Sequence, residues 1–160
     1  MALRFIVDHN VGKLARWLRM MGYDTLFFTG PDDGMMVKTA LQQERIILTR
    51  DSGVAARRLA TDGKITVILI EGENPSEQMR QVSGALKLDI SYRPFTLCLE
   101  CNCELVERTR EEVHGRVPPH VFKTCSSYME CLSCRRIYWR GTHWQAMCDT
   151  LAKFEKEFVN

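Results

Sequence analysis

The sequence predicts an α/β fold, in which a small doubly wound parallel sheet is followed by a cysteine-rich module. Over residues 1–90, short β-branched runs alternate with amphipathic segments, a pattern typical of βαβ units. All seven cysteines lie in the second half of the 160-residue chain, where this alternation stops. A composition of 45% hydrophobic and 26% charged residues is that of a folded globular protein.

The first part of the chain is expected to contain four strand–helix units. Apolar periodicity predicts strands at residues 4–8, 23–28, 45–49 and 65–70, and helices at 11–21, 53–62 and 76–86. A further helix is expected to start at the turn-like residues 31–33 and to end before the strand at 45–49. Gly22 ends the first helix because glycine adopts the left-handed backbone of a helix end at little cost. Pro75 precedes the last helix, where its fixed φ suits the first turn.

The apolar periodicity lapses between residues 88 and 96. We therefore predict a first domain at residues 1–90 and a second at 91–160, which ends in a helix. No apolar run approaches the roughly 20 residues of a membrane span, and no secretion signal is evident. The sequence thus predicts a cytoplasmic protein with no membrane association.

Two aspartates follow predicted strands of the first domain. Asp8 ends the first strand, and Asp51 lies two residues after the third. Parallel strands present their carboxyl ends at one edge of the sheet, where ligands bind. Converging carboxylates repel each other unless a cation or a proton lies between them, which predicts a magnesium or manganese site. The alternative is that each aspartate is a turn residue or a helix cap.

A third carboxylate is expected at the same edge. Asp32 and Asp33 lie where the loop after the second strand enters the next helix. Asp32 could equally cap that helix, and Asp33 could be a first-turn acid favoured by the helix dipole. Asn10 could offer its amide oxygen to the same cation or cap the helix that starts at Val11.

Basic residues accompany these acids. Lys13, Arg16 and Arg19 recur at three-residue spacing on the first predicted helix, and Arg50 precedes Asp51. They are candidates to bind a phosphate backbone, the alternative being an ordinary solvated helix face. The net charge of only +2 means that any nucleic-acid surface must be local. Acids with divalent ions and nearby cations form the apparatus of phosphodiester hydrolysis.

Two C-x-x-C knuckles predict a structural zinc site in the second domain, with Cys98, Cys101, Cys131 and Cys134 as ligands. An odd number of cysteines in a reducing compartment argues against a disulfide framework. A redox pair is the rival interpretation, but neither knuckle lies between a strand and a helix of the α/β unit. Four cysteine ligands leave no open coordination position, so this zinc is expected to stabilise the fold.

The other three cysteines, Cys103, Cys125 and Cys148, are interpreted as small buried residues, although Cys103 is close enough in sequence to replace Cys101. After the second knuckle, cations alternate with large aromatic residues, a combination that suits base stacking with phosphate contacts. Alternatively, the aromatic residues form the core of a small module. The candidates for RNA contact here are Arg135, Arg136 and Arg140, and the aromatic residues are Tyr138, Trp139 and Trp144.

Together these motifs resemble the Mut-seven carboxy-terminal RNase domain family, a PIN-like nuclease domain fused to a zinc ribbon. The resemblance rests on Asp8-His9-Asn10, the helix at 12–19 followed by Gly22-Tyr23-Asp24, the Leu48-Thr49-Arg50-Asp51 segment and both knuckles. It extends over nearly the whole chain, including residues 117–119 and 138–144. It implies that Asp8, one acid of the Asp32 and Asp33 pair, and Asp51 occupy the metal-binding positions of a PIN-like site.

Three functions are therefore considered. The favoured hypothesis is a metal-dependent ribonuclease, in which Asp8, Asp33 and Asp51 hold the cation. A second is a catalytically inactive module that binds RNA or regulates a partner. A third is a phosphoacceptor switch resembling receiver domains, but it needs a lysine after a late strand, where this chain has Glu71.

Overall fold

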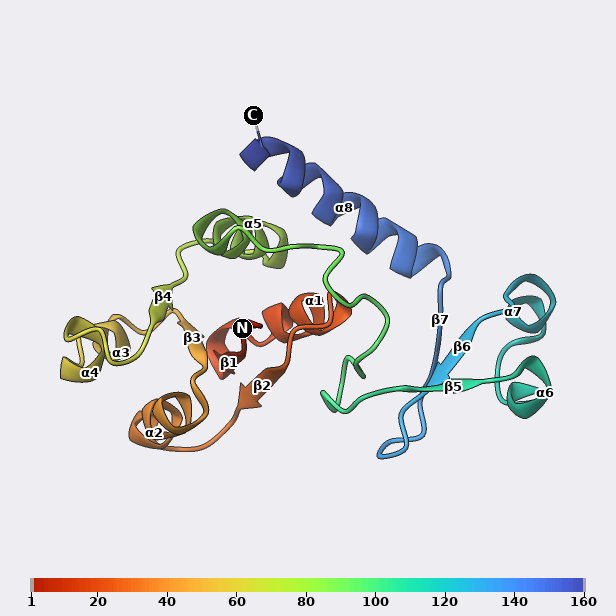
Figure 1. Cartoon of the computed structure of the whole chain (residues 1–160), viewed down its shortest axis with the longest axis horizontal. Coiled ribbons are helices and arrows are strands. Elements are labelled where there is room, and N and C mark those ends of the chain that lie inside the picture. Colours follow the sequence, from red (N-terminus) through yellow and green to blue (C-terminus); the bar gives the residue numbers. More distant parts are fainter. Residues whose placement is uncertain (1, 160) are drawn as a thin grey trace.

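Two β-sheets organise the protein, a four-stranded parallel sheet and a three-stranded antiparallel sheet (Figure 1). The computed structural model describes residues 2–159, and the side chains of residues 2–156. Helices lie along both faces of the parallel sheet, so the predicted α/β class is confirmed. No helix in the described part of the chain is long and apolar enough to cross a membrane.

The parallel sheet has the strand order β2-β1-β3-β4. Its strands are β1 (Phe5–Asp8), β2 (Thr25–Phe28), β3 (Ile46–Thr49) and β4 (Val67–Leu69). From β1 the chain moves outward to β2, crosses back to β3 and continues to β4 on the other side. The direction of winding therefore reverses between β1 and β3, and sheets of this kind bind ligands at the carboxyl ends of the strands at such a point.

Alternate residues of the buried strands face opposite helix layers, as the pleat of a strand requires. Phe5 and Val7 pack with α1 (Lys13–Met20) and α5 (Pro75–Leu86), whereas Ile6 packs with α2 (Asp33–Gln43). The short helices α3 (Ser52–Ala55) and α4 (Arg58–Thr61) cover the same face as α2.

Two helix boundaries differ from the prediction. The first helix begins at Lys13 and not at residue 11, because residues His9–Val11 form a 3-10 turn, η1, which Asp8 caps. The single helix expected at 53–62 is wrong, since Arg57 adopts an extended backbone and separates α3 from α4. This break lets Val54 and Leu59 contact the same apolar core.

Gly22, between α1 and β2, has a positive φ of 92°, and a Cβ added there would lie 2.2 Å from the backbone oxygen of Arg93. We expect Gly22→Ala to lower the free energy of unfolding by about 3 kcal/mol or more, because strain and a backbone clash combine. Urea denaturation would measure this. Gly63→Ala is the matched control, since Gly63 also has a positive φ but no neighbour within 4 Å of the added Cβ. Equal losses in both variants would contradict the clash.

The antiparallel sheet contains β5 (Val106–Arg108), β6 (Tyr128–Glu130) and β7 (Ile137–Trp139). Two short helices, α6 (Arg110–Val113) and α7 (Pro119–Thr124), connect β5 to β6. Val113 and Val121 from these helices pack against Tyr128 of β6. This insertion accounts for the long sequence separation of the two cysteine knuckles.

The C-terminal helix α8 (Thr142–Val159) leaves β7 and extends back along α5 (Figure 1). Its buried residues Met147, Leu151 and Phe154 belong to the same core as α1 and α5. The helix that was predicted at the end of the chain is therefore present, and it packs on the parallel-sheet unit. The boundary at residues 90 and 91 stays a prediction.

Candidate functional site

Asp8 lies at the carboxyl end of β1, next to β3, and is 1% exposed. Its Oδ2 accepts a 2.7 Å hydrogen bond from the hydroxyl of Thr49. The Thr49 oxygen also accepts a 3.0 Å hydrogen bond from the backbone N–H of Asp51. Thr49 therefore fixes the two aspartates relative to each other. Sequence reasoning missed this residue, although a hydroxyl side chain at the end of an otherwise apolar strand was a usable signal.

Asp33 is the third carboxylate at this edge. It is the first residue of α2, and its pKa is raised by burial, by side-chain contact with Asp51 and by the negative charges of Asp51 and Asp8. The charge of Arg57 opposes this rise. Asp32 instead caps α2, because its exposed Oδ1 accepts a 2.8 Å hydrogen bond from the backbone N–H of Gly34. Of the two candidates, Asp33 thus lies with the other acids.

Asp51 combines the two roles that the sequence left open. Its Oδ1 accepts a 2.8 Å hydrogen bond from the backbone N–H of Gly53 and caps α3. The same carboxylate lies beside Asp33. A cap held in this way orients the side chain, so the capping bond and a place in the acidic cluster are compatible.

Asn10 joins the loops after β1 and β3. Its amide nitrogen donates to Asp8 Oδ2 over 3.4 Å, and its amide oxygen accepts a 3.2 Å hydrogen bond from the backbone N–H of Arg50. It lies inside η1 and does not cap a helix starting at Val11. His9, which the prediction did not include, places its Nδ1 2.9 Å from Asp8 Oδ1. Its position directly after Asp8 was the signal.

Some of the predicted phosphate-binding cations are exposed near the acids. Lys13 lines a cavity of about 420 Å³ together with His9, Asn10 and Glu73. Arg50 is exposed, and its guanidinium donates a 3.0 Å hydrogen bond to the backbone oxygen of Gly72. Glu73 therefore places a further carboxylate beside Lys13, close to the acidic cluster.

The prediction of a continuous basic helix face is wrong for Arg19. This side chain is 7% exposed, and its guanidinium donates to the backbone oxygens of Thr25 (3.0 Å) and Leu99 (2.8 Å). Arg16 is half-buried and pairs with Glu100. The first cysteine knuckle packs against α1 at this point, so these arginines hold the chain together.

Four cysteines form a group that fits a zinc ion. Their sulfur atoms all lie within 4.8 Å of one another, and Cys98 Sγ is 3.7 Å from Cys134 Sγ. Two sulfurs bound at about 2.3 Å to a tetrahedral zinc lie roughly 3.8 Å apart, which agrees with this spacing. The other two members are Cys101 and Cys131. Among the described residues, these cysteines are the one group of three or more cysteine, histidine or acidic side chains found close enough together to hold a metal ion.

The two knuckles have matching backbone geometry. Asn102 and Arg135, each directly after the second cysteine of a knuckle, have positive φ angles of 63° and 65°. Their backbone N–H groups donate to the oxygens of Cys98 (2.9 Å) and Cys131 (2.8 Å). The Arg136 backbone also donates to the Cys134 sulfur and lowers the pKa of that thiol to about 6. In the first knuckle, burial and the neighbouring cysteines instead raise the pKa of Cys101 to about 12. The shared turn geometry, which places two sulfurs side by side, is what a metal site requires of both knuckles. Cys103 is exposed and lies outside the group, so the prediction that it is a buried residue is wrong; Cys125 and Cys148 are half-buried.

A buried carboxylate supports the second knuckle. Glu130 is 2% exposed and accepts hydrogen bonds of 2.7 Å from Arg116 and 2.8 Å from Arg108. These bonds lower its pKa to about 2. Glu130 precedes Cys131 in the chain, so the arginine pairs fix β6 at the point where the knuckle begins.

The three arginines proposed for RNA contact are exposed: Arg135, Arg136 and Arg140. The first lies 3.7 Å from Glu130, and the second donates to the sulfur of Cys134, which raises the arginine pKa. The third lies over the ring of Phe95, 5.1 Å from its centre. The aromatic residues beside them are half-buried, and they line a cavity described below.

Comparison with known proteins identifies the family. Residues 3–151 match the Mut7-C RNAse domain. No curated protein and no solved structure matches the chain. The family match covers nearly all of the sequence, including both the acidic cluster and the cysteine group. The chain therefore belongs to the Mut7-C RNAse domain family.

Proposed function

We propose that the protein is a divalent-metal-dependent ribonuclease that hydrolyses RNA phosphodiester bonds. Its active site would be formed by Asp8, Asp33 and Asp51. The observation that carries this proposal is the grouping of three carboxylates where the sheet changes its winding direction: Thr49 connects Asp8 to the Asp51 loop, and Asp33 lies beside Asp51. Membership of an RNase domain family supports RNA as the substrate.

The donor set fits Mg²⁺ or Mn²⁺, which prefer carboxylate oxygens. When bound, such a cation would activate a water and offset charge on the leaving oxygen. The protein would supply the rest of the site. Thr49 holds Asp8 and the Asp51 loop in register, while Lys13, Arg50 and Arg57 attract the phosphate backbone.

We further infer that residues 1–90 form a PIN-like nuclease domain and residues 91–160 a zinc ribbon that stabilises the fold and aids RNA binding. Arg135, Arg136 and Arg140 are the exposed cations that would contact RNA there. The contacts of Arg19 with Leu99 and of Arg16 with Glu100 hold the first knuckle against α1. They support the proposal that the two domains bind the same RNA.

The test compares the wild-type protein with an Asp8→Asn/Asp51→Asn double variant on structured and single-stranded RNA, followed on a gel. Without added divalent ion neither protein should cut. With Mg²⁺ or Mn²⁺ the wild type should cleave, and the double variant should show no cleavage but equal or tighter RNA binding, because repulsive charges are gone. Zinc content and thermal unfolding would show that both proteins are folded.

Cleavage by the double variant would contradict the assignment of the site. RNA binding by the wild type without cleavage in either metal would contradict the proposed nuclease activity. It would favour the alternative, a catalytically inactive RNA-binding module.

A further inference from the structure

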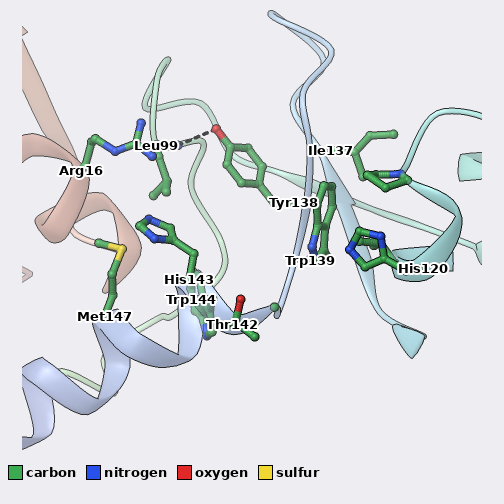
Figure 2. Close-up of a pocket in the computed structure, with 13 residues that line it drawn as sticks. Arg16, Leu99, His120, Ile137, Tyr138, Trp139, Thr142, His143, Trp144 and Met147 are labelled. Carbon is green, nitrogen blue, oxygen red and sulfur yellow. Dashed lines mark hydrogen bonds between the residues drawn. The ribbon is translucent and has the colours of Figure 1, made fainter. Parts of the chain in front are cut away.

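A second cavity, of about 410 Å³, lies between the antiparallel sheet and α1. Figure 2 shows its two walls. Tyr138, Trp139 and His120 come from β7 and α7 on one side, while Arg16 and His143 come from α1 and α8 on the other. Residues far apart in the sequence therefore meet around one hollow, away from the acids of the proposed active site.

The lining combines flat rings with positive or titratable groups. Three large aromatic residues, two histidines and one arginine contribute to it, and no lining residue carries a carboxylate. Aromatic rings stack on nucleobases of any sequence, and imidazole and guanidinium groups donate hydrogen bonds to base edges and phosphates. Because Arg16 pairs with Glu100, the flat rings and the histidine hydrogen-bonding groups carry the complementarity of this cavity to a nucleobase.

The walls are held in place before any ligand arrives. The hydroxyl of Tyr138 accepts a 3.2 Å hydrogen bond from the backbone N–H of Leu99. Trp144 packs edge-on against Phe95, with 4.9 Å between ring centres. Trp139 packs against the core formed by α6, α7 and β6. Ordered aromatic walls lower the entropic cost of binding a flat ligand.

We propose that this cavity binds one unstacked nucleobase of single-stranded RNA. The inference rests on the proposed function and deepens it by naming the form of the substrate. Helix α1 links the two sites, because Lys13 lies by the acidic cluster and Arg16, one turn later, lines the cavity. A strand that follows α1 would pass its backbone across the acids and place a neighbouring base between the aromatic walls.

The test measures binding without cleavage. Fluorescence anisotropy with a short labelled single-stranded RNA would use the Asp8→Asn/Asp51→Asn protein, loaded with zinc and without other divalent ions. Trp139→Ala should raise Kd about tenfold, since stacking contributes roughly 1–3 kcal/mol per base. His120→Ala and His143→Ala, at exposed positions where folding is not at risk, should each raise Kd several-fold.

His114→Ala is the matched control, because His114 is also an exposed histidine of the second half and stacks on Phe122 outside the cavity. Its Kd should equal that of the parent. An RNA with one abasic position should bind about as weakly as the Trp139→Ala complex, and the two losses should not add. Fully paired RNA should bind parent and variants alike, since a paired base cannot enter the cavity.

Equal affinity of parent and cavity variants for single-stranded RNA would overturn the proposal, as would undiminished binding of RNAs abasic at each position in turn. These outcomes are separate from those of the nuclease test. RNA binding that depends on the cavity, without cleavage, would contradict only the proposed nuclease activity. Cleavage with RNA binding that does not depend on the cavity would contradict only the proposed nucleobase site.

Discussion

Loss of zinc is expected to unfold the antiparallel sheet and to lower the Tm of the whole chain. Structural zinc contributes about 10–16 kcal/mol of binding free energy in small cysteine modules, which is comparable to the total stability of a domain. The apolar clusters of this part are small, so the cysteine group must supply much of its stability. Unfolding of this part should also destabilise the parallel sheet, because the Asn102 side-chain oxygen accepts a 2.9 Å hydrogen bond from the backbone N–H of Thr25.

Cys131→Ser tests this expectation, since Cys131 is fully buried within the group. The wild type should contain one zinc ion per chain, and the variant should contain much less and unfold at a clearly lower temperature, as followed by circular dichroism. Cys103→Ser is the matched control, because this exposed thiol lies outside the group. A Cys131→Ser protein with full zinc content and unchanged Tm would show that the group is not a structural metal site.

The sequence was most informative where local spacing determines geometry. Each C-x-x-C spacing places two sulfurs together in one turn, and the pair of such motifs predicted the four-cysteine group that the structure shows. The strand that ends in Asp8 was equally clear, because its apolar run has the length and composition of a buried strand. Local patterns could predict these features since no distant contact changes them.

Distant contacts explain what the sequence left open or predicted wrongly. Arg19 has the spacing of a surface cation, but the knuckle packed on α1 covers it, and nothing in a helical period reports that neighbour. The choice between Asp32 and Asp33 depended on which residue caps α2: Asp32 caps it, and Asp33, the next residue, contacts Asp51. Thr49 was missed as a site residue because threonine is common in strands, and only its place at the end of an apolar strand set it apart.

Substitution of Asp33 by asparagine is expected to remove cleavage and yet stabilise the metal-free fold. The variant should cleave RNA about 100-fold more slowly or worse, because a proposed metal ligand is lost. Burial, Asp51 and Asp8 raise the pKa of Asp33 in the folded protein, so the charged form costs stability at neutral pH. An amide removes this cost, and Tm without divalent ions should therefore rise.

The change of this Tm difference with pH tests independently whether the charged form of Asp33 destabilises the fold. A carboxyl whose folded-state pKa is raised contributes stability below its ordinary pKa of 3.8 and loses that contribution as pH rises through the folded-state value. The Tm difference between Asp33→Asn and wild type should thus be present at pH 7 and vanish below about pH 3.8, where both side chains are neutral. Thermal unfolding across this range would measure it.

Asp32→Asn provides the matched control on the neighbouring residue. Asparagine caps helices as well as aspartate does, so the bond to the Gly34 N–H should persist, and both cleavage and Tm should stay close to wild type. If Asp32→Asn abolished cleavage while Asp33→Asn left it intact, the acid assigned to the site would be the wrong member of the pair. A fall in Tm for Asp33→Asn would mean that the Asp33 carboxyl supports the fold, and that repulsion among the three carboxylates does not destabilise the metal-free protein.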